Sequence, residues 1–159
     1  MRGDILFSPD GTKLFVGGSQ SLVNSWSLES KKVTKSMGGR SVDDVSLAMS
    51  EEDYVLFAGC ARDLTAFDVR TGKMIWTVRV HPSLVEDVAR HPTLPLVATA
   101  GNDGTVAIVN SGSGKLEKRL RLGPSRGKLT QVDFSPDGKL LAVAMSNGAV
   151  VVMQSMLDD

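Results

Sequence analysis

The sequence predicts an all-β protein, a partial β-propeller of about four blades whose last blade lacks its outer strand. Three observations carry this prediction. The pentapeptide FSPDG begins at residues 7 and 134, which are 127 residues or three steps of about 42 apart, and a period of about 40–45 residues is typical of four-stranded propeller blades. Short runs rich in Val, Leu, Thr and Phe alternate with Gly, Asn, Asp and Pro, as strands alternate with turns. Nowhere does the chain carry a convincing apolar stripe of helical period.

The repeats divide a single domain, residues 1–159, at approximately 1–38, 39–80, 81–122 and 123–159. In each repeat a turn segment leads into a first apolar run, and these runs begin at Lys13, Tyr54, Leu96 and Leu140. A small polar turn and a second apolar run follow. The first runs at residues 54–59 and 140–145 show no polar alternation. We therefore expect both to be strands that are buried on both faces.

Turn chemistry and edge chemistry complete the description of the repeats. Asp103-Gly104 and Asn147-Gly148 are typical of two-residue hairpin turns, because these residue types tolerate a positive φ. Residues 115–122 alternate leucine with charged side chains. That pattern predicts an outer strand, where charges discourage sheet-to-sheet aggregation.

The chain resembles the WD-repeat family. The resemblance rests on FSPDG at both positions, on the hairpin LVATAGNDGTVAIVN at 96–110, and on His81 with Val85 and Val88 ahead of it. In that family a His, a Ser or Thr, an Asp and a Trp form a buried hydrogen-bonded set. The resemblance implies these roles for His81, Thr99 and Asp103, while Val109 stands at the position of the Trp.

A finer resemblance concerns a subfamily. The segments HPTLPLVATAGNDGTVAIVN and FSPDGKLLAVAMSNGAVVV are similar to propellers of the echinoderm microtubule-associated-protein-like subfamily. If the chain shares that subfamily's role, it is a propeller segment that binds tubulin.

Four repeats are fewer than the seven blades of most WD-repeat propellers. We expect fifteen strands, which make three full blades and one blade of three strands. An open arc of this kind exposes an apolar blade face at each end. Three interpretations remain open: the chain is part of a longer protein, two copies close an eight-bladed ring as a homodimer, or the chain forms a compact four-bladed ring or an isolated arc.

Composition and charge exclude several kinds of site and partner. Eighteen basic and eighteen acidic side chains cancel, so the global charge predicts neither a nucleic-acid nor a membrane partner. Cys60 is the single cysteine, which rules out an internal disulfide. His81 and His91, without a cysteine or carboxylate cluster, make a poor metal site. We expect no metal, no cofactor and a cytoplasmic location, with cytoskeletal and nuclear locations open.

One local patch is basic, and it suggests a partner. Its residues lie between positions 115 and 128, where Glu117 is the one acid: Lys115, Lys118, Arg119, Arg121, Arg126 and Lys128. On an outer strand and the loop after it, they suit an acidic surface such as a tubulin tail. No aromatic residues interleave, which argues against single-stranded nucleic acid. The alternative is a protected edge strand.

The sequence therefore predicts a non-catalytic scaffold that binds protein partners. A function from another class is an enzyme with its site in the propeller channel. Such a site needs His, Asp or Glu side chains that converge from several blades. The chain has two histidines, so we expect no enzyme.

Overall fold

The computed structural model describes residues 3–18, 22–39, 44–50, 54–122 and 127–155. These residues form fifteen strands in four antiparallel sheets, three of four strands and a last one of three. The prediction of an all-β, propeller-like fold with an incomplete last blade is confirmed. Within the described ranges there is no helix that could cross a membrane.

Each sheet uses consecutive strands in chain order. The first sheet contains β1 (Ile5–Phe7), β2 (Lys13–Gly17), β3 (Val23–Ser27) and β4 (Lys32–Met37). The second contains β5 (Val45–Ser50), β6 (Val55–Cys60), β7 (Asp63–Asp68) and β8 (Met74–Arg79). The third contains β9 (Val85–Arg90), β10 (Leu96–Gly101), β11 (Thr105–Asn110) and β12 (Leu116–Arg121). The fourth contains β13 (Leu129–Phe134), β14 (Leu140–Met145) and β15 (Val150–Gln154).

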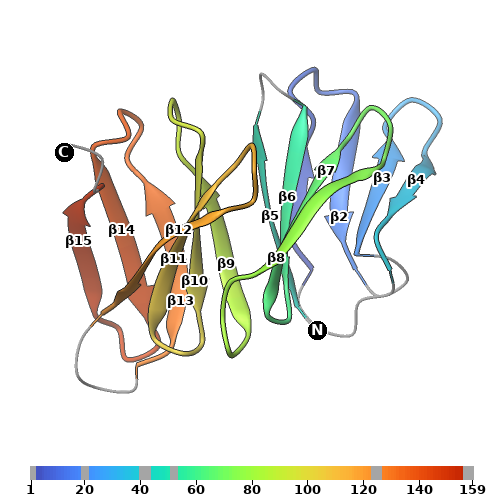
Figure 1. Ribbon diagram of the computed structural model, residues 1–159. Coiled ribbons are helices and arrows are strands. Elements are labelled where there is room, and N and C mark those ends of the chain that lie inside the picture. Colours follow the sequence, from blue (N-terminus) through green and yellow to red (C-terminus); the bar gives the residue numbers. More distant parts are fainter. Residues whose placement is uncertain (1–2, 19–21, 40–43, 51–53, 123–126, 156–159) are drawn as a thin grey trace.

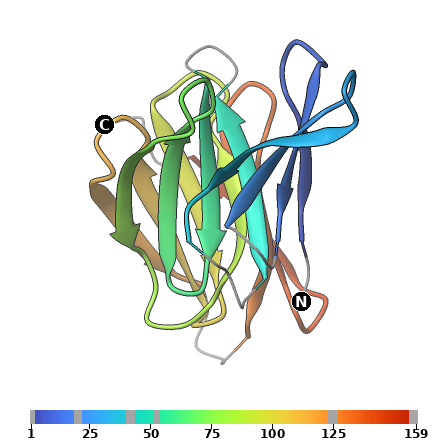
Figure 2. The same cartoon turned by 90° about the vertical axis from the view of Figure 1, so that its right-hand side faces the viewer.

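The four sheets stand side by side as an arc (Figure 1). In Figure 2 the first sheet, in blue, lies nearest the viewer and the others follow behind it. The first strands of neighbouring sheets, β1, β5, β9 and β13, contact one another and form the inner edge. The fourth strands, such as β8 and β12, form the outer edge. Apolar side chains fill the three spaces between the sheets as separate core clusters, so burial of sheet faces is what holds the arc together.

The hairpin turns differ from the prediction. In the β10–β11 turn, Gly104 N–H donates to Gly101 O at 3.1 Å, and only Gly104 has a positive φ, of 77°. The β14–β15 turn repeats this, with Gly148 at 83°. Each loop is therefore a four-residue turn with a hydrogen bond from its fourth N–H to its first carbonyl, and the fourth residue is a glycine with a left-handed backbone conformation. The prediction of two-residue turns was wrong, because Asp103 and Asn147 do not adopt a positive φ. Instead, the side chain of each accepts a hydrogen bond from the N–H two residues further on.

Burial of the second strands depends on the place of the sheet in the arc. In β6 the residues from Leu56 to Gly59 are buried, so the prediction for residues 54–59 holds for the middle of the strand, whereas Val55 is half-buried and Tyr54 is exposed. In β14, by contrast, Leu140 is exposed and Ala142 only half-buried. The expectation for residues 140–145 was wrong because the fourth sheet has a neighbour on one side alone.

Candidate functional site

A buried histidine organises the third sheet. His81 follows β8 and has no exposed surface. Its Nδ1–H donates to Asp103 Oδ2 at 3.2 Å, and its Nε2 accepts from the Thr99 hydroxyl at 2.8 Å. A carboxylate can only accept, so Nδ1 carries a proton, and burial, which lowers the pKa of the ring, favours the neutral form in which Nε2 is an acceptor. The structure thus brings His81, Thr99 and Asp103 together in one hydrogen-bonded set.

A fourth member of this set is Thr105, which sequence reasoning missed. Its hydroxyl donates to Asp103 Oδ1 at 2.6 Å and lies 3.1 Å from His81 Nδ1. Its position two residues after Asp103 was the available signal, because an Asp often binds the N–H two residues on. Val109 is fully buried in the apolar core between sheets two and three. Thr105 therefore completes the hydrogen-bonded set, and Val109, at the position of the family's Trp, packs in the core instead.

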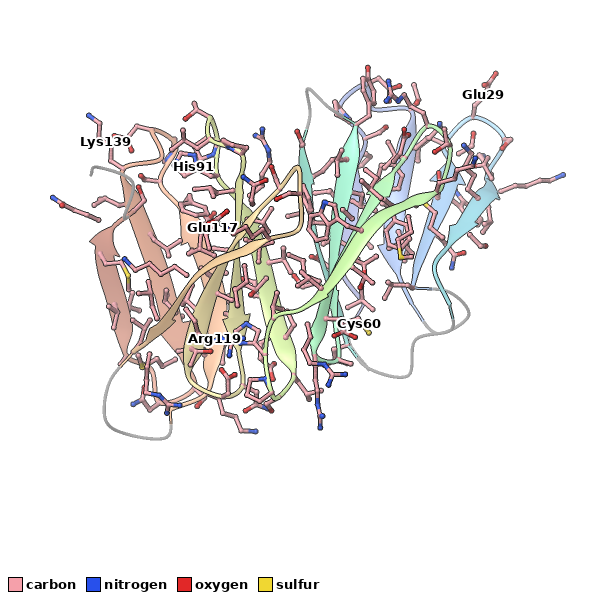
Figure 3. All side chains as sticks on the ribbon, in the orientation of Figure 1. Glu29, Cys60, His91, Glu117, Arg119 and Lys139 are labelled. Carbon is pink, nitrogen blue, oxygen red and sulfur yellow. The ribbon has the colours of Figure 1, made fainter. Side chains whose placement is uncertain are left out.

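The two histidines share a direction of pKa shift. Burial lowers the pKa of His81 below its usual value, against the opposing effect of Asp103. Burial also lowers the pKa of His91, whose Nε2–H donates to Gly138 O at 3.0 Å and ties sheet three to the β13–β14 turn. Figure 3 shows His91 at the same end of the arc as Lys139. Both rings are neutral, buried and fully engaged, so neither can reach a substrate.

The inner edge carries a repeated polar link between sheets. Asp4 Oδ2 accepts from Leu47 N–H at 3.1 Å, and Ser46 Oγ accepts from Val88 N–H at 3.2 Å. Asp87 Oδ2 accepts from Val132 N–H at 2.9 Å. Strand register makes Ser46, Asp87 and Gln131 equivalent, because they pair with Gly59, Ala100 and Ala144.

These links place negative charge on the inner edge. A hollow of about 610 Å³ lies there, and its lining includes four carboxylates: Asp4, Asp44, Glu86 and Asp87. Burial raises the pKa of Asp87, although hydrogen bonds from Val132 and Ser46 favour its charged form. The formal net charge of zero therefore combines an acidic inner edge with basic side chains on the outer strand β12.

The basic patch is smaller than the sequence suggests. The Arg119 guanidinium donates to the Val80 carbonyl, beside the His81 set, and Lys115 lies 3.1 Å from Glu117. Lys118, Arg121 and Lys128 are exposed. Arg126 lies outside the described residues. In Figure 3, Glu117 and Arg119 mark the course of β12 across the outer edge.

Other reactive groups do not assemble into a site. Within the described ranges, no three His, Cys, Asp or Glu side chains converge as metal ligands would. Cys60 is half-buried against the core between sheets one and two, at the lower end of β6 in Figure 3.

Comparison with known proteins identifies the repeats. Residues 72–110 and 115–152 match the family described as "WD domain, G-beta repeat". WD repeat-containing protein 55 of Rattus norvegicus is 24% identical over 147 residues, which is 92% of this chain and 38% of the relative. The protein of the same name from Homo sapiens is 26% identical over 150 residues, with the same coverage of both chains.

A shorter match reaches a differently named protein. Autophagy-related protein 21 of Schizosaccharomyces pombe is 29% identical over 106 residues, or 65% of this chain and 32% of the relative. The matched part of the chain thus spans 38% of the length of the first two relatives and 32% of the third. The matched repeats and the two relatives named for WD repeats support the WD-repeat family, and the names of these relatives give no support to the echinoderm microtubule-associated-protein-like subfamily. The WD-repeat family is supported by the two matched repeats, by relatives that align with 92% of the chain, and by the four antiparallel sheets.

Proposed function

We propose that this chain is a non-catalytic WD-repeat scaffold that binds protein partners and works as part of a larger propeller or assembly. The observation that carries the proposal is the exposure of apolar side chains on both end sheets. The side chains equivalent to Ile5 and Val150 are buried wherever a neighbouring sheet is present. Monomeric proteins rarely leave contiguous apolar faces uncovered.

The first sheet shows this on the face that points away from the second. Ile5 is 63% exposed, whereas Leu47, Val88 and Val132 at the equivalent positions are buried. Phe7 is 61% exposed on the same face. Each of these positions faces the preceding sheet inside the arc.

The fourth sheet shows the same on its opposite face. Val150 is 65% exposed, whereas Val23, Leu64 and Val106 at the equivalent positions have no exposed surface. Val152 is 59% exposed beside it. Inside the arc, every junction is formed by one face of each of these two kinds packed against the other. Each exposed end face therefore suits a further propeller sheet as its partner.

The test is direct reconstitution with variants of the end faces. The chain is first purified together with the proteins that remain bound to it, which are the candidate partners. Each candidate is then purified separately and mixed with the chain, and the mass of any complex is measured by analytical ultracentrifugation. We expect defined complexes that Ile5→Lys or Val150→Lys disrupts, while the exposed control Glu29→Lys leaves them intact. Complexes that survive both end-face variants, or a chain that stays alone at 16.9 kDa with every candidate, would contradict the proposal.

Closure by a second copy is the simplest such assembly. Two arcs would contribute eight sheets in a head-to-tail ring, because each end face is presented once by each copy. Sedimentation of the pure chain decides this case. A mass twice that of one chain supports the homodimer, and a stable single chain points to sheets from another protein or from a longer parent chain.

Binding to an acidic surface such as tubulin rests on the exposed cations of β12. Co-pelleting with microtubules at low salt tests it, with Lys118→Glu and Arg121→Glu as the disrupting variants. Arg119 is left unchanged, because its contact with Val80 makes it part of the fold. A cytoplasmic or nuclear location is tested by imaging a fluorescent fusion.

A further inference from the structure

The outer strands carry one position that binds the next sheet. Strand register pairs Lys35 with Ser25, Trp76 with Ala66 and Lys118 with Ile108, each just before a bulge. Lys35 donates to the carbonyl of Arg70, and Trp76 Nε1–H donates to Ser111 O at 3.1 Å. The three side chains are therefore equivalent, and the first two reach the turn that follows the third strand of the next sheet.

At the second position an indole fills the space between sheets. The Trp76 ring lies 5.9 Å from the Phe57 ring and packs on the backbone of Gly114. A Cβ at Gly114 would come within 2.7 Å of the ring, so the glycine is required for this contact. Trp76 also packs against the core between sheets two and three.

At the third position the space is open. Lys118 replaces the tryptophan, and a cavity of about 310 Å³ lies between sheets three and four. This is the low end of the roughly 300–1,000 Å³ that ligand pockets span. Its apolar wall is built from both sheets: Leu96, Ile108, Leu120, Phe134, Leu141 and Met153.

The rim of this cavity is polar and carries positive charge. Lys118 lines it directly, together with the polar side chains of Asn110, Gln154 and Ser155. The one lining carboxylate, Glu117, is already 3.1 Å from Lys115. Figure 3 marks Glu117, which lies on β12 beside Lys118.

We infer that this cavity is a docking site for an aromatic side chain, tryptophan above all, in a partner peptide with acidic residues beside it. The indole at the equivalent junction defines the shape and chemistry that fit, and the cationic rim selects the flanking charge. The inference rests on the proposed function, since it assigns a site to a protein-binding scaffold.

The isoleucines make the test specific, because the chain has three of them, Ile5, Ile75 and Ile108, and only Ile108 lines the cavity. The probe is the acetylated, amidated tripeptide Asp-Trp-Asp, added to chain labelled with 13C at isoleucine methyls. We expect the Ile108 signal to move in a saturable way and the Ile5 signal to stay. Asp-Ala-Asp should have no effect, and Lys-Trp-Lys should bind about fivefold more weakly.

Two substitutions of one residue separate the cavity from the charge. Lys118→Trp should fill the cavity with its own indole, shift Ile108 without peptide and abolish the response to Asp-Trp-Asp. Lys118→Ala should keep the response to N-acetyltryptophanamide and weaken only the acidic peptide. Should Lys118→Trp fail to fold, the contrast between the Trp and Ala peptides on the unaltered chain decides alone.

An Ile108 signal that does not move, that moves equally with Asp-Ala-Asp, or that still responds in Lys118→Trp would overturn the inference. Partner complexes that persist in Lys118→Trp would also remove the site from the interaction while leaving the scaffold function intact. Conversely, peptide binding without any partner complex would count against the scaffold function alone.

Discussion

Asp87 accepts a hydrogen bond from Val132 N–H at 2.9 Å and another from the Ser46 hydroxyl at 2.9 Å. One carboxylate on β9 therefore joins the innermost strands of three consecutive sheets. Its removal leaves the Val132 N–H without its acceptor at a sheet junction. The cost of such an orphaned donor is about 1–3 kcal/mol.

We accordingly expect Asp87→Ala to lower the free energy of unfolding by about 1–3 kcal/mol, measured by urea denaturation. Asp87→Asn should cost less, because the amide oxygen can still accept from Val132. The neighbouring exposed Glu86 is the matched control, and Glu86→Ala should stay within about 0.5 kcal/mol. Equal losses in the two alanine variants would show that the link contributes nothing.

The hydroxyl of Thr99 can be deleted without changing the shape of its side chain. Thr99→Val leaves the buried Nε2 of His81 without a partner, and we expect a loss of about 1–3 kcal/mol in the free energy of unfolding. Thr93→Val, at an exposed position of the same sheet's first turn, should change stability by less than about 0.5 kcal/mol. A neutral Thr99→Val would mean that the ring has another partner.

The family's tryptophan should not be restorable at position 109. Val109 is fully buried, and Thr105 already completes the hydrogen-bonded set. We expect Val109→Trp to destabilise the chain by about 1–3 kcal/mol through overpacking. A raised melting temperature would contradict this.

Acidification should weaken the fold before any carboxylate of ordinary pKa titrates. The folded-state pKa values of His81 and His91 lie below the usual 6.5, so the unfolded chain binds these protons first. Stability is therefore full above about pH 6.5 and falls as the pH drops through the folded-state values, by at most about 1.4 kcal/mol per pH unit for each ring.

Urea midpoints at pH 7.5, 6.5 and 5.5 measure this effect, and the Cε1–H signals of the two rings report each titration separately. Either ring titrating above pH 6.5, or a midpoint that does not fall, would be inconsistent with neutral buried histidines.

The two tryptophans should respond unequally to truncation. Trp76 packs on Phe57 and donates to Ser111, whereas Trp26 lies on the outward face of the first sheet with 38% of its surface exposed. We expect Trp76→Ala to cost about 2 kcal/mol, below the roughly 3–5 of a fully buried aromatic because the ring is only half-buried. Trp26→Ala in the isolated chain should cost less than about 1 kcal/mol. A reversed order in thermal unfolding would contradict the packing.

The period of the sequence was enough to predict the four sheets and the incomplete last one, because apolar runs and turns recur whatever residues fill them. The links along the inner edge were not predictable in the same way. Asp4, Ser46 and Asp87 share a position but not one residue type, and each accepts from a backbone N–H of the next sheet, a group that no side-chain pattern reveals. Arg119 shows a second limit, because its long side chain reaches the Val80 carbonyl and a charge pattern cannot show that direction.

The recurrence of the inner-edge link at every junction has a consequence for how the chain unfolds. Each sheet is held mainly by its immediate neighbours, so the arc behaves as a short linear chain of coupled units, and the middle junctions transmit stability between the ends. A weakened junction at Ser46 or Asp87 should therefore uncouple the two halves, and hydrogen exchange would then report two separate melting units where the intact arc has one.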